Sequence, residues 1–154
     1  MKLATLMVGA ALGLCACVSN AGLRDAEKLA IYKAHAGAPV PSFQYFGSIN
    51  SWTSLGDSDI AVWTRPNQAY LLELYGPCSD IEFTPVISVT SQMGRVNARF
   101  DKVIAHNRGS IEIPCTIEQI RPLDVKAIKQ AEKVAREQSA TAQSSTAEPP
   151  GAGT

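Results

Sequence analysis

The chain has 154 residues, and its 14 Lys and Arg residues balance its 14 Asp and Glu residues, so the formal net charge at pH 7 is +0. A neutral chain has no excess of positive charge with which to bind nucleic acid, and we expect no nucleic-acid partner. The length allows one compact domain of roughly 100–115 residues once an export segment and a tail are set aside.

The N-terminus has the pattern of an export signal. Lys2 is followed by an apolar run over residues 3–14. A run of this length suits a signal peptide and is well short of the roughly 20 residues that a membrane-spanning helix needs. We therefore predict that residues 1–16 are a signal peptide.

Residues 14–17, Leu-Cys-Ala-Cys, resemble the lipobox of bacterial lipoproteins, in which a Leu precedes the modified cysteine by three positions and a small residue precedes it directly. The resemblance implies that Cys17 receives acyl chains such as palmitate and becomes the first residue of the mature protein. Val18 follows in place of the Asp that favours inner-membrane retention, which implies an outer-membrane lipoprotein facing the periplasm, with the membrane as a partner. The alternative is ordinary cleavage after residues 19–21, Ser-Asn-Ala, which would release a soluble periplasmic protein.

The remaining cysteines form an even pair. With Cys15 removed in the signal and Cys17 lipidated, Cys78 and Cys115 are left in an oxidising compartment, and we predict a structural disulfide between them. Closing a loop of about 37 residues would stabilise the fold by roughly 3.8 kcal/mol in the loop-entropy model. The pair is not a C-x-x-C motif, and neither of the two histidines has metal-ligand spacing, so we predict no metal and no cofactor.

The first elements after the signal are a helix and a linker. Residues 24–36 are rich in Ala, Leu, Lys and Glu and predict a short helix with Gly37 as its C-cap. Pro39 and Pro41 forbid helix. Residues 17–41 are therefore expected to hold the lipid anchor, this lead-in helix and the linker.

The next part of the chain, residues 42–138, predicts a β-rich domain with a C-terminal helix. The expected strands cover residues 42–49, 60–65, 69–75, 86–90, 95–104 and 111–117. The second and third flank a Pro-Asn-Gln turn and predict a hairpin, in which Tyr70, Leu72 and Leu74 face inward.

Alternation also predicts which side chains of the later strands face the core. Val96, Ala98 and Phe100 should share one face of their strand, opposite Asp101. Ile111, Ile113, Cys115 and Ile117 alternate with polar residues, which places Cys115 toward the core.

The end of the chain reads as a helix and a tail. Pro122 should close the sheet, and Asp124 should cap a helix over residues 125–138. Residues 139–154 have too few apolar side chains to offset the entropy of ordering, and we predict a disordered tail. The predicted fold is α+β: a curved antiparallel sheet or small, partly open barrel of about six strands, with a short N-terminal helix and a C-terminal helix.

Four segments, residues 70–74, 76–81, 99–103 and 114–123, resemble a family of small proteobacterial exported proteins with a domain of unknown function. The most specific part is the pair of cysteines, each in its local setting of Gly-Pro-Cys-Ser-Asp and Pro-Cys-Thr-Ile-Glu. The resemblance covers roughly residues 43–124 and implies export, often lipidation, and a paired-cysteine domain. It implies no activity.

Aromatic residues gather between residues 43 and 75, which leaves two interpretations open. They can pack in the core, or some of them can form an exposed surface for a small apolar ligand or an envelope protein. The candidate surface comprises Trp52, Trp63 and Tyr70, with Arg65 as a polar contact. We therefore predict a periplasm-facing lipoprotein that is a non-enzymatic binding or envelope-associated module.

The alternative is a small periplasmic hydrolase or other enzyme that uses His106. The chain has no G-x-S-x-G elbow and no glycine-rich phosphate loop, so a nucleophilic site would need dispersed residues, with Asp101 as the partner of His106. We expect His106 instead to lie in the turn before Gly109, and we predict no catalytic residue.

Overall fold

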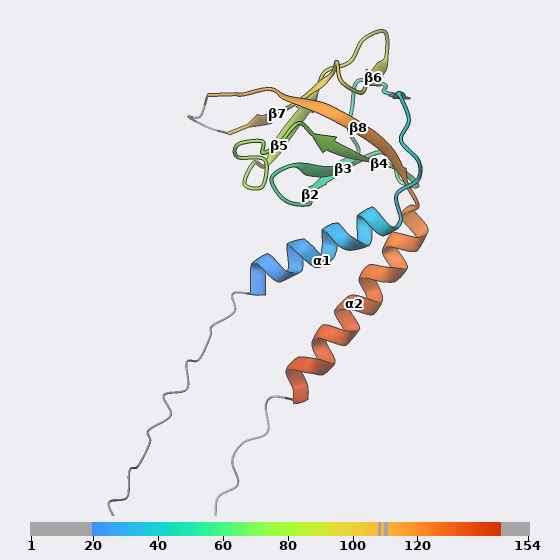
Figure 1. The fold of residues 1–154 in the computed structure, drawn as a ribbon, viewed down its shortest axis with the longest axis vertical. Coiled ribbons are helices and arrows are strands. Elements are labelled where there is room, and N and C mark those ends of the chain that lie inside the picture. Colours follow the sequence, from blue (N-terminus) through green and yellow to red (C-terminus); the bar gives the residue numbers. More distant parts are fainter. Residues whose placement is uncertain (1–19, 108, 110, 146–154) are drawn as a thin grey trace, which may run out of the picture.

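The structure is a computed structural model, and it describes residues 20–107, 109 and 111–145. This part of the chain forms two α-helices and eight β-strands (Figure 1). The helices are α1 (Asn20–Ala34) and α2 (Val125–Ser145). The strands are β1 (Ser42–Gln44), β2 (Ser51–Ser54), β3 (Asp59–Arg65), β4 (Gln68–Leu74), β5 (Val86–Val89), β6 (Arg95–Asn97), β7 (Lys102–His106) and β8 (Cys115–Leu123).

Six of the strands form one curled antiparallel sheet in the order β2-β3-β4-β8-β7-β5, while β1 and β6 pair with each other (Figure 1). The sheet curves into an open half-barrel, which α1 precedes and α2 follows in the sequence. The predicted α+β fold, with a curved antiparallel sheet and a helix at each end, is therefore confirmed.

The predicted hairpin is the pair β3–β4, and both of its faces are buried. Ile60, Val62 and Leu72 belong to one apolar cluster, whereas Ala61 and Leu71 belong to a second. Successive side chains of a strand point to opposite faces, so burial on both faces requires a continuous apolar run. The hairpin is thus the middle layer of a three-layer arrangement.

The first apolar cluster fills the inside of the curl. β1 and β6 contribute Phe43 and Val96, and β8 contributes Ile117 and Ile120, both fully buried. Burial of one such aliphatic side chain contributes roughly 1.5–3 kcal/mol. The β1–β6 pair therefore packs against the inner face of the six-stranded sheet.

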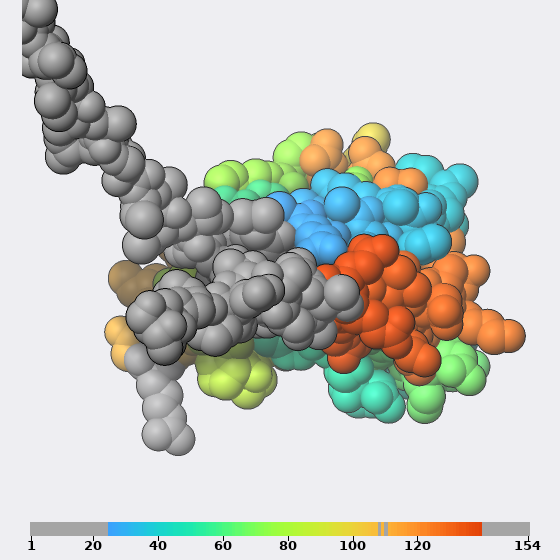
Figure 2. Space-filling view, turned by 90° about the horizontal axis from the view of Figure 1, so that it is seen from below, coloured from blue at the N-terminus to red at the C-terminus, as the bar shows by residue number. Residues whose placement is uncertain are grey.

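The second apolar cluster lies between the sheet and the helices. Tyr32 of α1 and Val125 and Ile128 of α2 pack with Leu71 of β4, and α1 and α2 lie side by side across this face (Figure 2). Burial, and then the neighbouring Glu132 carboxylate, raise the pKa of Tyr32 above its ordinary value. The helices are therefore docked through apolar packing and a tyrosine that stays neutral.

The predicted C-cap role of Gly37 is wrong. α1 ends at Ala34, and Gly37 is not one of the glycines with positive φ. Its N–H donates to the Pro122 carbonyl at 2.8 Å, and a Cβ here would lie 3.1 Å from Pro122 Cγ. Glycine suits this position because the linker runs close against β8.

Two predicted strands are broken by turns. Residues 42–49 contain only β1, because the chain bends at Gly47, where φ is 84°, before it enters β2. Residues 95–104 are divided into β6 and β7 by a turn in which Arg99 has a φ of 68°. The turn reverses the predicted faces: Phe100 is 74% exposed and Asp101 is 2% exposed.

The Asp101 carboxylate explains the second break. It accepts hydrogen bonds from the Asn97 N–H at 2.7 Å and from the Thr90 hydroxyl at 2.7 Å. A side chain that bonds nearby backbone competes with the strand ladder, and here it holds a turn where alternation alone predicts a continuous strand.

The last strand is displaced along the sequence from its predicted position. Ile111 and Ile113, which we expected in the core, are 88% and 58% exposed and precede β8. Pro122 does not close the sheet but lies within β8, paired with Tyr70. Its carbonyl bonds Gly37, on the side away from β4, so the missing proline N–H is not needed in the β4 ladder.

Asp124 caps α2 as predicted. Its Oδ1 accepts hydrogen bonds from the N–H groups of Lys126 at 3.1 Å and Ala127 at 3.0 Å. The helix continues to Ser145, past the predicted end at residue 138 and into the segment for which we predicted disorder. Residues 146–154 lie outside the described part of the chain.

Candidate functional site

The four residues of the predicted aromatic surface do not share one face. Trp52 pairs with Val62, and Val62 pairs with Tyr70, so Trp52 and Tyr70 lie on the face of the sheet toward the inside of the curl. Trp63 lies on the opposite face, beneath the helices, and Arg65 stands at the end of β3.

Trp52 packs against the inner apolar cluster, and each of the other three side chains contacts a different aromatic residue. Tyr70 stacks on Phe43 with ring centroids 4.3 Å apart, and Trp63 meets Tyr32 edge-on at 6.2 Å. The Arg65 guanidinium lies 5.4 Å from the centroid of the Phe46 ring. The four side chains therefore do not form a single recognition surface.

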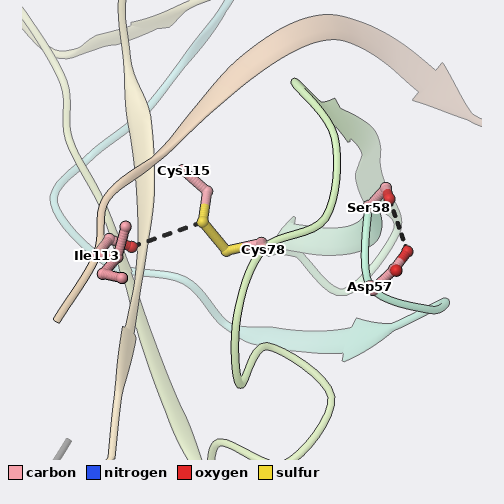
Figure 3. The surroundings of a disulfide bond; sticks show 5 residues. All are labelled: Asp57, Ser58, Cys78, Ile113 and Cys115. Atoms are coloured by element: carbon pink, nitrogen blue, oxygen red, sulfur yellow. Dashed lines mark hydrogen bonds between the residues drawn. A yellow bond between two sulfur atoms is a disulfide. The ribbon is translucent and has the colours of Figure 1, made fainter. Parts of the chain in front are cut away.

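The predicted disulfide between Cys78 and Cys115 is confirmed (Figure 3). The two Cα atoms lie 5.8 Å apart across a sequence separation of 37. Cys78 is buried, and its N–H donates to the Asp57 carbonyl at 2.7 Å, which fixes the turn after β4 against the turn before β3. The disulfide thus joins these two turns to Cys115, the first residue of β8.

A surface groove of about 840 Å³ lies away from the disulfide and the aromatic pairs. Four segments line it: the linker at residues 39–41, the turn at 92–95, the loop at 97–100 and residues 118–120 of β8. A site of this volume falls within the range of about 300–1,000 Å³ that small-molecule sites occupy.

Two non-glycine residues with positive φ shape the groove. Met93, with φ 51°, is the fully exposed tip of the turn that Gln92 and Arg95 close, and Arg99 has φ 68°. Such backbone costs of order 1–3 kcal/mol for each residue and is found at functional sites. The groove's floor is equally irregular, because β8 has a bulge at Glu118, where Gln119 and Ile117 pair with successive residues of β4.

The groove combines apolar lining with three charged side chains, those of Arg95, Arg99 and Glu118, so its positive charges outnumber its negative ones. Met93 and Phe100 are exposed, and Val40 lines the groove beside them. The Arg95 guanidinium is oriented by bonds to the Ser42 hydroxyl at 2.7 and 3.1 Å. Within the described residues the Arg99 guanidinium has no side-chain partner, so it is available to an anionic group.

A second polar constellation surrounds His106 on the outer face of β5 and β7. His106 Nε2 lies 2.8 Å from Ser88 Oγ, and His106 Nδ1 lies 2.7 Å from Glu112 Oε1. Asp101, the partner that the sequence suggested for His106, instead bonds Asn97 and Thr90. His106 is the last residue of β7 rather than part of the turn before Gly109.

Sequence reasoning missed both features for identifiable reasons. A methionine at the tip of a two-residue turn, in Gln-Met-Gly, is the signal that points to an exposed apolar contact. Ser88 lies in β5 and Glu112 in the segment before β8, and the pairing of β5 with β7, which the sequence does not reveal, is what brings Ser88 to the His106 imidazole.

The described residues contain neither a metal-binding cluster nor a membrane-crossing helix. No group of three or more His, Cys, Asp or Glu side chains there is arranged to hold a metal ion. Neither α1 nor α2 has the length and apolar composition of a membrane-crossing helix. Residues 1–16 and Cys17, the predicted signal and lipidation site, lie outside the described residues.

A family model describes almost the whole chain. The match extends over residues 1–139 and is to a family of unknown function, DUF6491. The chain belongs to this family. No curated protein and no solved structure matches it. The membership agrees with the paired cysteines that suggested a family of unknown function, and it assigns the DUF6491 domain no activity.

Proposed function

We propose that this DUF6491 protein is an outer-membrane lipoprotein facing the periplasm, anchored through Cys17, whose surface groove binds a small apolar ligand without chemically changing it. The ligand class is an acyl chain that ends in an anionic group. The observation that carries the proposal is the 840 Å³ groove, in which exposed apolar side chains stand beside two arginines.

The lining supports an acyl ligand over a polar one. Met93 and Phe100 are exposed, and covering them would stabilise a complex by roughly 25 cal/mol per Å² of apolar surface. Methionine adapts to flexible apolar partners because its side chain is unbranched and polarizable. An alkyl chain is the simplest partner that matches this surface.

The charges support an anionic end on that chain. Arg95 and Arg99 line the same groove, and a guanidinium binds carboxylate or phosphate through two parallel hydrogen bonds. Arg95 is held in place by Ser42, so part of the entropy of ordering its side chain is already lost before the ligand arrives.

The arrangement of the elements suits attachment at the N-terminus. The first turn of α1 and the last turn of α2 lie at one end of the molecule, whereas β6, which borders the groove, lies at the other (Figure 1). An anchor at Cys17, shortly before α1, would leave the groove open to the periplasm. The signal-like residues 1–16 and the lipobox-like residues 14–17 support the anchor.

The experiment titrates the full chain in detergent with 11-(dansylamino)undecanoic acid and follows dansyl fluorescence. Phe100→Ser should weaken binding about tenfold, because burial of an aromatic side chain contributes roughly 1.5–3 kcal/mol. Arg99→Gln should weaken it by a similar factor through loss of a charge-assisted hydrogen bond.

Phe83→Ser is the matched control, because Phe83 is 81% exposed but lies outside the groove. Equal loss of binding in Phe83→Ser and Phe100→Ser would contradict the groove as the binding site. The anchor is tested in the same host by incorporation of an alkyne-palmitate analogue, which Cys17→Ser should abolish and Cys15→Ser should leave intact.

A further inference from the structure

We propose that Ser88, His106 and Glu112 form a nucleophilic centre that hydrolyses small carboxylic esters. The proposal is independent of the groove, because none of the three residues lines it. The serine hydroxyl lies 2.8 Å from His106 Nε2, and Glu112 Oε1 lies 2.7 Å from His106 Nδ1. Both distances fall within the 2.6–3.2 Å reach of a nucleophile and its base and of a base and its orienting group.

The two strands fix the first contact. Ser88 pairs with Ile104, and His106 pairs with Val86, so Ser88 and His106 are diagonal neighbours on the same face of the sheet. The alternating residues Ile87, Val89 and Ala105 are buried on the inner face. Ser88 and His106 therefore point outward, toward substrate, and the β5–β7 ladder holds their backbones.

The acidic partner comes from the segment between β7 and β8. Glu112 contacts the ring nitrogen that faces away from Ser88, so it holds the tautomer in which Nδ1 carries the proton and Nε2 accepts one. Glu112 thus acts as a positioning residue for the imidazole, which is the role of the acid in a Ser-His-acid triad.

The edge of the sheet supplies a donor for the oxyanion. β5 is the terminal strand, and the Thr90 N–H donates to the Lys102 carbonyl at 2.9 Å. Because ladder bonds alternate along an antiparallel strand, Ser88 also bonds β7, and the N–H of Val89 points to the open edge. The N–H of the residue after the nucleophile is a common oxyanion donor in serine hydrolases.

The reaction follows from these positions. Ser88 Oγ adds to the ester carbonyl carbon while His106 Nε2 takes the hydroxyl proton, and the Val89 N–H bonds the oxyanion. The intermediate collapses, the C–O bond to the alcohol breaks, and His106 returns the proton to the departing alkoxide. Water then adds to the acyl-serine and gives its proton to His106, which passes it to Ser88 Oγ as the carboxylic acid leaves.

The exposure of the site sets the substrate class. His106 and Glu112 side chains are 36% and 51% exposed, so the centre is open to solvent. An open centre admits small or surface-presented acyl groups and provides little binding energy for large ones. Short-chain esters with good leaving groups are therefore the expected substrates.

The test treats the full chain with a fluorophosphonate probe and locates the phosphonylated serine by peptide mass spectrometry. We expect Ser88 to be labelled at least tenfold faster than Ser51, an exposed serine on β2, the opposite edge strand. His106→Gln should slow labelling of Ser88 by about 10²-fold or more, because general-base assistance contributes roughly 10²–10⁴-fold.

Two further variants separate positioning from folding. Glu112→Ala should slow labelling, and Glu112→Asp should restore most of the rate, which a merely structural role would not produce. Ser88→Cys should react with iodoacetamide faster than Ser51→Cys in an otherwise unchanged chain. Equal labelling of Ser88 and Ser51, or unchanged labelling in His106→Gln, would overturn the proposal. Neither result would bear on binding of the dansyl fatty acid, which is tested separately at the groove.

Discussion

β8 pairs with β4 along one edge and with β7 along the other, and these two strand pairings, called seams below, differ in length. On one side, β8 pairs with β4 from Ala69↔Leu123 to Leu74↔Ile117, and the helices cover this half of the sheet. On the other side, β8 meets β7 only at Lys102↔Thr116 and Val103↔Cys115. The half formed by β5 and β7 therefore depends on other links to the rest of the molecule.

Those other links are one covalent bond and a set of hydrogen bonds, which include the backbone bond from the Ile117 N–H to the Asp101 carbonyl at 3.0 Å. Cys115 belongs to the short seam itself and carries the disulfide to Cys78. Nearby, the buried Asp101 carboxylate bonds Asn97 and Thr90, which joins the ends of β6 and β5. A disulfide and a buried charge are thus found where the hydrogen-bonded ladder is shortest.

Removal of the disulfide should have the largest effect. Cys78→Ala with Cys115→Ala should lower the free energy of unfolding by about 4 kcal/mol, because a loop of about 37 residues is no longer constrained in the unfolded chain. Urea denaturation measures the loss. Amide hydrogen exchange should accelerate in β5 and β7 more than in β3 and β4.

The exchange pattern is what tests the comparison. Uniform acceleration across all strands would show that the two halves unfold as one unit and that the seams do not differ in strength. Retention of full stability after removal of both sulfurs would contradict the structural role of the bond.

Loss of the buried charge should have the second largest effect. Asp101→Asn keeps the shape of the side chain but replaces charge-assisted hydrogen bonds, so we expect about 2 kcal/mol of destabilisation. Thermal unfolding and exchange of the Asn97 amide measure it. Asp57→Asn is the control, because the Asp57 carboxylate is exposed and, among the described side chains, accepts a hydrogen bond only from the neighbouring Ser58 hydroxyl. An equal loss of stability in Asp57→Asn would show that burial of the Asp101 charge is not what stabilises the turn.

The well-paired half is also the half that the sequence predicts best. Alternation around the Pro-Asn turn predicted the β3–β4 hairpin and its inward residues Tyr70 and Leu72, and Asp124 marked the start of α2. These signals are local: a turn, a cap and a period of two residues. Local signals hold where neighbouring strands continue without interruption.

The half formed by β5 and β7 was harder to predict, because its structure depends on contacts between residues that are distant in the sequence. Nothing near Asp101 in the sequence shows that Thr90 will donate to it, and this bond supports the turn that interrupts the predicted strand. Ile111 and Ile113 alternate as a strand would, yet they precede β8 and are exposed. An alternating pattern needs a partner strand, and the sequence alone does not show which partner is present.

The candidate sites also divide into one that local counting predicts and others that depend on contacts between distant residues. The disulfide was predictable by counting cysteines, which needs no geometry. The groove was not, because its lining comes from four separate segments, and the aromatic residues that suggested a surface are divided between two faces. The contact of His106 with Ser88 and Glu112 likewise needs the register of β5 and β7.

Removal of the helix cap should have the smallest effect and should be confined to the helix-covered half. Asp124→Ala should cost about 1 kcal/mol, because two N–H groups in the first turn of α2 lose their acceptor. Asp124→Asn should retain most of the stability, since an amide oxygen is also a good cap. Exchange should accelerate at Lys126 and Ala127 without change at β5 and β7. Equal acceleration in both halves would mean that α2 and the β5–β7 pair share one unfolding unit, and the weak β7–β8 seam would then not be a boundary within the domain.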